Sequence, residues 1–391
     1  MKNNFSTKES IKEKKNFYFL GVLFFLLIIS EPFNKSYNGA ILLFTSIIVF
    51  FNIYGSIFEY LPKKFLYFLI YNLVYLFFSL LNLFPKSWTK YYEISAIPQQ
   101  SFIIFLFPLL FIFFNKKFNE KSFQDDISFA NSILILAVVH RIIIFYFFSP
   151  NITNLDFLKI TTLNNFSSLF IVSFFLYMHY IKNKFINFLI LIIFFYLSYI
   201  SPYSQNLLLA TAILPIWLFP RYSKIIIIGF ISTILISYLY FFLNLEIAKK
   251  LDINFPIRII FAYDIILALK DTYFIGVGYG TESLTNYYEQ FNIFNFMSDY
   301  DEKFIFMTPH NSFLTIMFRT GIIGLFLFIF FLKYCFDQIY LDVNNLRLIK
   351  LKSSLFLSFF TLIFFNPGLE GIAYILSASL YLSLVYSNNL K

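Results

Sequence analysis

Long apolar runs are the feature of this sequence that most restricts its fold. Twelve stretches of 15 to 22 residues are almost wholly apolar, and charged side chains gather between them. A helix of roughly 20 apolar residues spans the hydrocarbon core of a bilayer, because its backbone polar groups bond within the helix. We therefore predict an all-α, polytopic membrane protein with about 12 transmembrane helices.

The predicted spans are joined by short connections and one long loop. They cover residues 16–33, 39–59, 65–84, 101–115, 128–149, 165–181, 185–201, 206–220, 224–244, 312–333, 351–366 and 370–387. Glu31 and Pro32 follow the first run where a signal-peptide cleavage site needs small residues, so we expect an uncleaved helix. The runs are continuous, unlike β-barrel strands, and no internal repeat is evident. Residues 1–391 are thus predicted to form a single integral membrane domain.

The composition excludes several other classes of protein. Charged residues make up 13% of the chain, about half the roughly 25% typical of soluble domains. Cys335 is the single cysteine, so no intrachain disulfide can form. One cysteine and three histidines in the whole chain cannot supply a usual structural zinc site. The net charge of +9 is dispersed between apolar runs, which suits a membrane protein better than a nucleic-acid-binding one. We expect no cofactor, no metal and no nucleic acid.

The distribution of basic residues predicts the orientation. With both termini cytoplasmic, 19 of the 30 Lys and Arg residues fall in inner segments and 9 in outer ones. Five of those 9 lie in a single long loop, residues 245–311, which the positive-inside rule weights less. This loop on the outer face is expected to contain a short surface helix over 257–269, where apolar residues have helical spacing.

The long loop carries a glycine-rich segment, Gly276-Val277-Gly278-Tyr279-Gly280. Alternating glycines let the backbone turn sharply and approach a ligand or another helix closely. The segment is not a phosphate-binding P-loop, because no Gly-Lys-Ser/Thr follows at the required distance. We expect these glycines to shape a site rather than to react.

The loop ends in Thr308-Pro309-His310-Asn311, directly before the span that begins at residue 312. Thr308 is a suitable N-cap and Pro309 a suitable first-turn residue. His310 would then lie at the positive end of a helix, which lowers the pKa of an imidazole and keeps it neutral. A neutral imidazole is what a general base requires.

Helical geometry predicts what lies below His310. At 100° per residue, Gly321 and Gly324 share its face of the helix, so a groove wide enough for a lipid chain or a close neighbouring helix is expected there. Arg319 would face away from this groove. Arg319 and the pair His140-Arg141 are charged or titratable side chains inside predicted spans, which makes them functional candidates.

Together these residues resemble the O-antigen ligase/polymerase superfamily of bacterial inner membranes. The resemblance covers about residues 258–330 and consists of Arg258, the three alternating glycines, His310-Asn311-x-x-Leu314 and Gly321-x-x-Gly324, in that order. Each motif is weak alone, but their order on a chain with one large outer loop is fairly specific. The sequence departs from the family at Arg319, where an acidic residue is commoner before the glycine.

The resemblance implies a metal-independent glycosyltransferase of the inner membrane with its active site facing the periplasm. The donor would be a glycan on undecaprenyl diphosphate, and the acceptor lipid A-core in a ligase or a second lipid-linked glycan in a polymerase. Arg258 would bind the donor diphosphate and His310 would activate the acceptor hydroxyl. Arg141 could be a second diphosphate ligand, or could pair with Glu31 or Glu370.

Three alternatives stay open at this point. A polymerase usually has two comparable periplasmic loops, whereas the second-largest outer loop here, 85–100, has only 16 residues, which favours a ligase. A transporter of lipid-linked glycans would tend to show internal repeats and interrupted helices. A binding or assembly subunit would tolerate replacement of His310 and Arg258.

Overall fold

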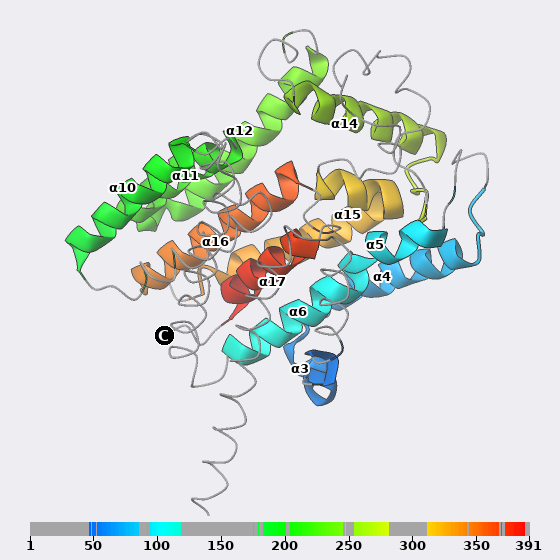
Figure 1. Cartoon of the computed structure of the whole chain (residues 1–391), viewed down its shortest axis with the longest axis horizontal. Coiled ribbons are helices and arrows are strands. Elements are labelled where there is room, and N and C mark those ends of the chain that lie inside the picture. Colours follow the sequence, from blue (N-terminus) through cyan, green and yellow to red (C-terminus); the bar gives the residue numbers. More distant parts are fainter. Residues whose placement is uncertain are drawn as a thin grey trace, which may run out of the picture.

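The regular structure of the chain is helical throughout the part that the computed structural model describes (Figure 1). The described residues are 53–85, 94–118, 183–200, 204–244, 254–280, 311–341, 344–366 and 372–387, with single positions at 47, 49–51, 92, 175, 179, 247 and 369. The longer helices are α4 (Lys63–Leu80), α6 (Phe102–Phe118), α10 (Lys184–Ile200), α11 (Ser204–Leu218), α12 (Ser223–Leu243), α14 (Asn254–Asp271), α15 (Ser312–Gln338), α16 (Leu346–Phe365) and α17 (Ile372–Tyr386).

Short helical segments connect or flank these helices. They are η1 (Tyr54–Ser56), α3 (Ile57–Tyr60), η3 (Ile94–Ala96), α5 (Ile97–Gln100) and η4 (Pro220–Tyr222). Within the described residues four helices are long and apolar enough to span a membrane: Lys63–Leu80, Pro220–Leu243, Ser312–Gln338 and Leu346–Phe365. Shorter apolar helices cover Phe102–Lys116, Gln205–Leu218 and Tyr374–Tyr386. The prediction of an all-helical chain is confirmed for this part, and the count of twelve spans stays a prediction.

Most described helices lie within a few residues of their predicted spans. The two shortest predicted spans, 101–115 and 206–220, correspond to α6 and α11. Each of these helices contains a proline, Pro108 in α6 and Pro215 in α11. The helix α16 begins five residues earlier than predicted, because Arg347 and Lys350 continue the helix rather than interrupt it. The predicted spans 16–33 and 128–149, nearly half of 39–59 and most of 165–181 lie outside the described residues.

Small side chains bring the central helices into close contact. Helix α17 packs along both α6 and α16, and Ser383 of α17 is fully buried with its hydroxyl donating to the Phe111 carbonyl of α6 at 3.0 Å. Small residues let helix backbones approach closely in membranes. Helix α16 lies at the centre of the bundle, since 89% of its most apolar 18-residue window is buried. Helix α12 lies at the periphery, since only 11% of its window is buried.

The Ser383 contact generates a stability prediction. Ser383→Leu adds volume where α17 meets the α6 backbone, so we expect the variant to lose about 1–3 kcal/mol of stability through overpacking. The measurement is thermal unfolding of the purified chain in detergent. Thr233→Leu is the matched control, since Thr233 is exposed on α12. Equal unfolding midpoints for the two variants would contradict the packing described here.

Candidate functional site

The glycine-rich loop is joined to α15 by an exchange of backbone hydrogen bonds. Val277 N–H donates to the Phe318 carbonyl and Gly278 N–H to the Arg319 carbonyl, each at 2.9 Å, and Ile322 N–H donates to the Phe274 carbonyl at 3.1 Å. In a straight helix the carbonyls of residues 318 and 319 would accept from residues 322 and 323. The loop therefore replaces helical hydrogen bonds that α15 lacks at this point.

Gly321 is where α15 departs from helical geometry. Its φ of 71° and ψ of −171° divide α15 into two helical parts joined by a kink. A Cβ on Gly321 would overlap the Ile275 carbonyl, and a Cβ on Gly276 would lie 2.5 Å from Gly321 N. Both glycines are thus required by the close approach of two backbones. Of the alternatives open for the alternating glycines, Gly276 makes a close approach to another helix, and a role of these glycines in shaping a site stays a prediction.

Helices α4 and α5 hold the same loop from the other side. Tyr75 donates its hydroxyl hydrogen to the Ile275 carbonyl at 2.7 Å, and the Tyr279 hydroxyl donates to Asn72 Oδ1 at 2.7 Å. Tyr279 N–H donates to Ser79 Oγ at 2.7 Å, and Gly280 N–H donates to Gln100 Oε1 at 2.6 Å. These buried polar groups are satisfied by one another, so the loop has a single defined position.

The groove predicted along Gly321 and Gly324 is not formed by the described residues. The helical progression of 100° per residue stops at Gly321, so the straight helix on which this prediction depended is not present. The backbone of Phe274 and Ile275 fills the space at Gly321, and the Thr320 side chain fills the space at Gly324. Arg319 is 2% exposed, and its guanidinium carbon lies 5.2 Å from the centre of the Phe318 ring.

The first turn of α15 is fixed by Asn311. Its side-chain oxygen accepts from Phe313 N–H at 2.9 Å and Leu314 N–H at 3.1 Å, so Asn311 is the N-cap and the predicted Thr308 is not. Ser312 reaches the neighbouring loop, where its hydroxyl donates to the Asn366 carbonyl at 3.3 Å. His310, like His140 and Arg141, lies outside the described residues.

Arg258 lies in α14 at its junction with α12 and the end of α16. The Tyr238 hydroxyl of α12 donates to the Arg258 carbonyl at 3.0 Å, and the Arg258 guanidinium carbon lies 5.8 Å from the centre of the Phe365 ring. The guanidinium is half-buried. Helix α14 packs on α15 through a small cluster that includes Ile265, Leu269 and Phe318. Arg258 thus belongs to a helix that packs against α12 and α15, and Asn311 is the N-cap of α15.

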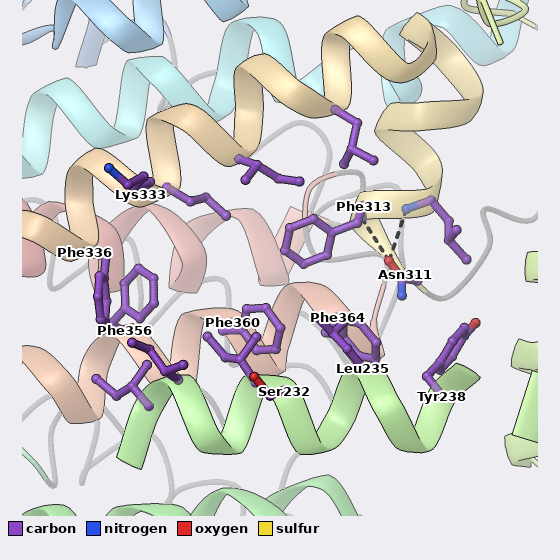
Figure 2. Close-up of a pocket in the computed structure, with 17 residues that line it drawn as sticks. Ser232, Leu235, Tyr238, Asn311, Phe313, Lys333, Phe336, Phe356, Phe360 and Phe364 are labelled. Carbon is purple, nitrogen blue, oxygen red and sulfur yellow. Dashed lines mark hydrogen bonds between the residues drawn. The ribbon is translucent and has the colours of Figure 1, made fainter. Parts of the chain in front are cut away.

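An apolar groove of about 500 Å³ runs between α12, α15 and α16 (Figure 2). Figure 2 shows Asn311 and Tyr238 at one end and Lys333 and Phe336 at the other. Its walls are Ile227, Ile228, Ile231, Ser232, Leu235, Tyr238, Asn311, Phe313, Leu314, Leu325, Ile329, Leu332, Lys333, Phe336, Phe356, Phe360 and Phe364. A channel with so few polar groups can hold a hydrocarbon chain but cannot bind a sugar.

Sequence reasoning did not find this groove. Leu235 lines it, whereas the adjacent Ile236 faces outward and is 67% exposed, and the two residues are chemically equivalent. Tyr238, which connects the groove to Arg258, carries no sequence signal among 29 tyrosines. Within the described residues no group of three or more His, Cys, Asp or Glu side chains could hold a metal ion. Metal-independent chemistry itself stays a prediction.

Comparison with known protein families now bears on these positions. Residues 167–329 match the family described as O-antigen ligase. The chain carries an O-antigen ligase family domain. No curated protein matches the chain. Members of this family are enzymes that transfer lipid-linked glycans, and the apolar helices together with the family indicate a multi-pass membrane protein.

The O-antigen ligase match separates the predicted site residues into two groups. Arg258, the three loop glycines, His310, Asn311, Arg319, Gly321 and Gly324 all lie within residues 167–329. His140 and Arg141 lie outside it. The structure joins the loop glycines to Arg319 and Gly321 directly, and it joins Arg258 to the end of the groove where Asn311 lies.

The kink generates a prediction with a matched control inside the chain. Gly321→Ala places a Cβ against the Ile275 carbonyl at a positive φ, so we expect a loss of at least about 1–2 kcal/mol. Gly229→Ala in α12 meets nothing within 4 Å and should leave the stability unchanged or slightly higher. Thermal unfolding of both variants in detergent measures the difference. A Gly321→Ala midpoint as high as that of Gly229→Ala would refute the clamped kink.

Proposed function

We propose that this chain transfers a glycan from undecaprenyl diphosphate to an acceptor hydroxyl at the periplasmic face of the inner membrane. The acceptor we favour is lipid A-core, which makes the activity that of an O-antigen ligase. One observation carries the proposal. The apolar groove ends at Asn311, the neighbour of His310, and its wall residue Tyr238 is hydrogen-bonded to the backbone of Arg258.

The two parts of this arrangement suit the two parts of the donor. A polyprenyl chain is apolar, and the groove offers it apolar walls on three helices. A diphosphate is anionic, and Arg258, whose backbone is hydrogen-bonded to the groove residue Tyr238, offers a planar, permanently charged donor of paired hydrogen bonds. The donor lipid would thus lie with its tail between α12 and α15 and its diphosphate toward α14.

The chemistry needs one base and one group that stabilises the leaving diphosphate. The acceptor oxygen attacks the anomeric carbon, its proton passes to the His310 imidazole, and the bond from that carbon to the diphosphate oxygen breaks. Negative charge then develops on undecaprenyl diphosphate, where Arg258 stabilises it. Arg141 is a second candidate for this role, and His140 and Arg319 are weaker candidates. No metal is required in this scheme.

Transfer assays on variants test the assignment. His310→Ala should reduce transfer about 10²–10⁴-fold, the range typical for loss of a general base. Arg258→Ala should also abolish most transfer, and Arg258→Lys should recover only part of it, because lysine cannot bind a diphosphate in the same bidentate way. Lys270→Ala is the control, since Lys270 is a basic residue at the far end of α14 and is exposed.

The assay uses purified full-length protein, an undecaprenyl-diphosphate glycan and two acceptors offered separately, lipid A-core and a second lipid-linked glycan, without added metal. Transfer to lipid A-core supports the ligase, and transfer to the lipid-linked glycan would establish a polymerase instead. Full activity in the His310 and Arg258 variants would reject the proposed site. No transfer to either acceptor by folded protein would favour a transporter of lipid-linked glycans.

The groove makes a separate prediction. Leu235→Trp should fill part of the groove and lower kcat/KM for the long-chain donor, because the polyprenyl tail loses its place. Ile236→Trp makes the same change one residue away, on the exposed face of α12, and should leave kcat/KM unchanged. Donors with progressively shorter prenyl chains should be less affected by Leu235→Trp. Equal effects of the two tryptophans would show that the tail binds elsewhere.

A further inference from the structure

The segment that follows α16 contacts four other helices, at the end of the groove where Asn311 lies (Figure 2). Helix α16 ends at Phe365, because Pro367 cannot continue a helix and favours an extended conformation in the residue before it. Asn366 accordingly has a φ of −138° and a ψ of 163°. We call four residues of this segment the corner: Phe364, Phe365, Asn366 and Leu369.

Two hydrogen bonds join the corner to the start of α15. The Ser312 hydroxyl donates to the Asn366 carbonyl and accepts from the Leu369 N–H, each at 3.3 Å. Ser312 and Leu369 are each 1% exposed, so both bonds are shielded from water. In the sequence Ser312 is two residues after His310, the proposed base. The corner therefore fixes the first turn of the helix that follows this base.

The corner also contacts Arg258, the proposed ligand of the diphosphate. The Arg258 guanidinium carbon lies 5.8 Å from the centre of the Phe365 ring. Tyr238, whose hydroxyl donates to the Arg258 carbonyl, has its ring centre 5.5 Å from that of Phe364, in an edge-to-face arrangement. Both kinds of contact favour one relative geometry of the groups involved. One short segment thus contacts both the start of α15 and the residue proposed to bind the diphosphate.

The side chain of Asn366 holds the corner itself in place. Its amide nitrogen donates to Gln205 Oε1 of α11 at 3.0 Å and to the Leu362 carbonyl of α16 at 3.2 Å. An amide nitrogen carries two hydrogens, so both donors are used. Asn366 is 8% exposed. The position of the corner therefore depends on this side chain and on its partner Gln205.

We propose that Ser312 and Asn366 are positioning residues for the transfer reaction. They hold the start of α15 and Arg258 at one fixed separation, and neither has to touch a substrate. This inference rests on the proposed function. There the base acts on the acceptor oxygen and the arginine on the diphosphate oxygen, the two atoms that exchange at the anomeric carbon. A displacement of about 1 Å in such an arrangement can lower the rate about 10²-fold.

Ser312→Ala tests the link between the corner and α15, because it removes both hydrogen bonds. We expect kcat to fall about tenfold while KM for the donor changes less than about twofold, since the apolar groove is unaltered. Rates are expressed per donor-binding site, titrated with labelled undecaprenyl-diphosphate glycan, so that unfolded protein is not counted. Ser358→Ala is the matched control. Ser358 is also buried, but its hydroxyl donates within α16, to the Ser354 carbonyl at 2.9 Å, and this variant should retain the wild-type kcat.

A double-mutant cycle tests the link between the corner and α11. Gln205→Ala and Asn366→Ala should each lower kcat severalfold. The double variant should lose no more than Asn366→Ala alone, because the two changes remove the same hydrogen bond. Losses that multiply in the double variant would show that the two residues act separately, and would overturn the role proposed for Asn366.

Deuterium exchange provides a readout that does not depend on activity. The backbone N–H of Leu369 should exchange severalfold faster in Ser312→Ala than in Ser358→Ala, because it loses its acceptor. Unchanged exchange would overturn the contact on which the inference is built. Equal kcat in the two serine variants of an active enzyme, or a raised KM with unchanged kcat, would overturn the inference and leave the proposed function standing. Absence of transfer by the wild-type protein would overturn the proposed function, and the inference with it.

Discussion

The exchange of backbone hydrogen bonds between residues 274–278 and α15 is the interaction on which the surrounding structure depends. In a bilayer an unsatisfied backbone N–H or C=O costs several kcal/mol, so a transmembrane helix can bend sharply only where other groups replace its lost bonds. Here the loop supplies both donors and an acceptor, and Gly276 and Gly321 permit the approach. The direction of the first part of α15, and with it the position of Asn311, follows from this contact.

The helices of the described part were largely predictable, because apolar runs must satisfy their backbone within themselves. The start of α16 at Leu346 was not, since the predicted span begins only after Arg347 and Lys350, although arginine and lysine are good helix formers. The kink was also beyond sequence reasoning. A glycine inside an apolar run fits a straight helix equally well, and the partners that bend α15 at Gly321 come from residues 274–278.

The sequence proposes residues for the candidate site but does not predict the architecture around them. Arg258, the glycine segment and the His310-Asn311 pair were found from motif order, and the O-antigen ligase match over residues 167–329 includes them. Which of Thr308 and Asn311 caps α15 depends on tertiary contacts, because either residue type can cap a helix. The groove depends on which apolar side chains of α12 turn toward α15 and α16, and residue identity carries no such information.

The contacts of α4 also impose an order on assembly. Tyr75 and Ser79 bond to residues 200 positions further along the chain, and Asn72 bonds to Tyr279, 207 positions away. During synthesis α4 therefore enters the bilayer long before its polar partners exist. Its hydroxyl and amide groups have to be hydrated or provisionally bonded until the glycine loop has been made. The contacts that position the candidate site can form only after α15 has followed, and α16 and α17 pack onto the bundle later still.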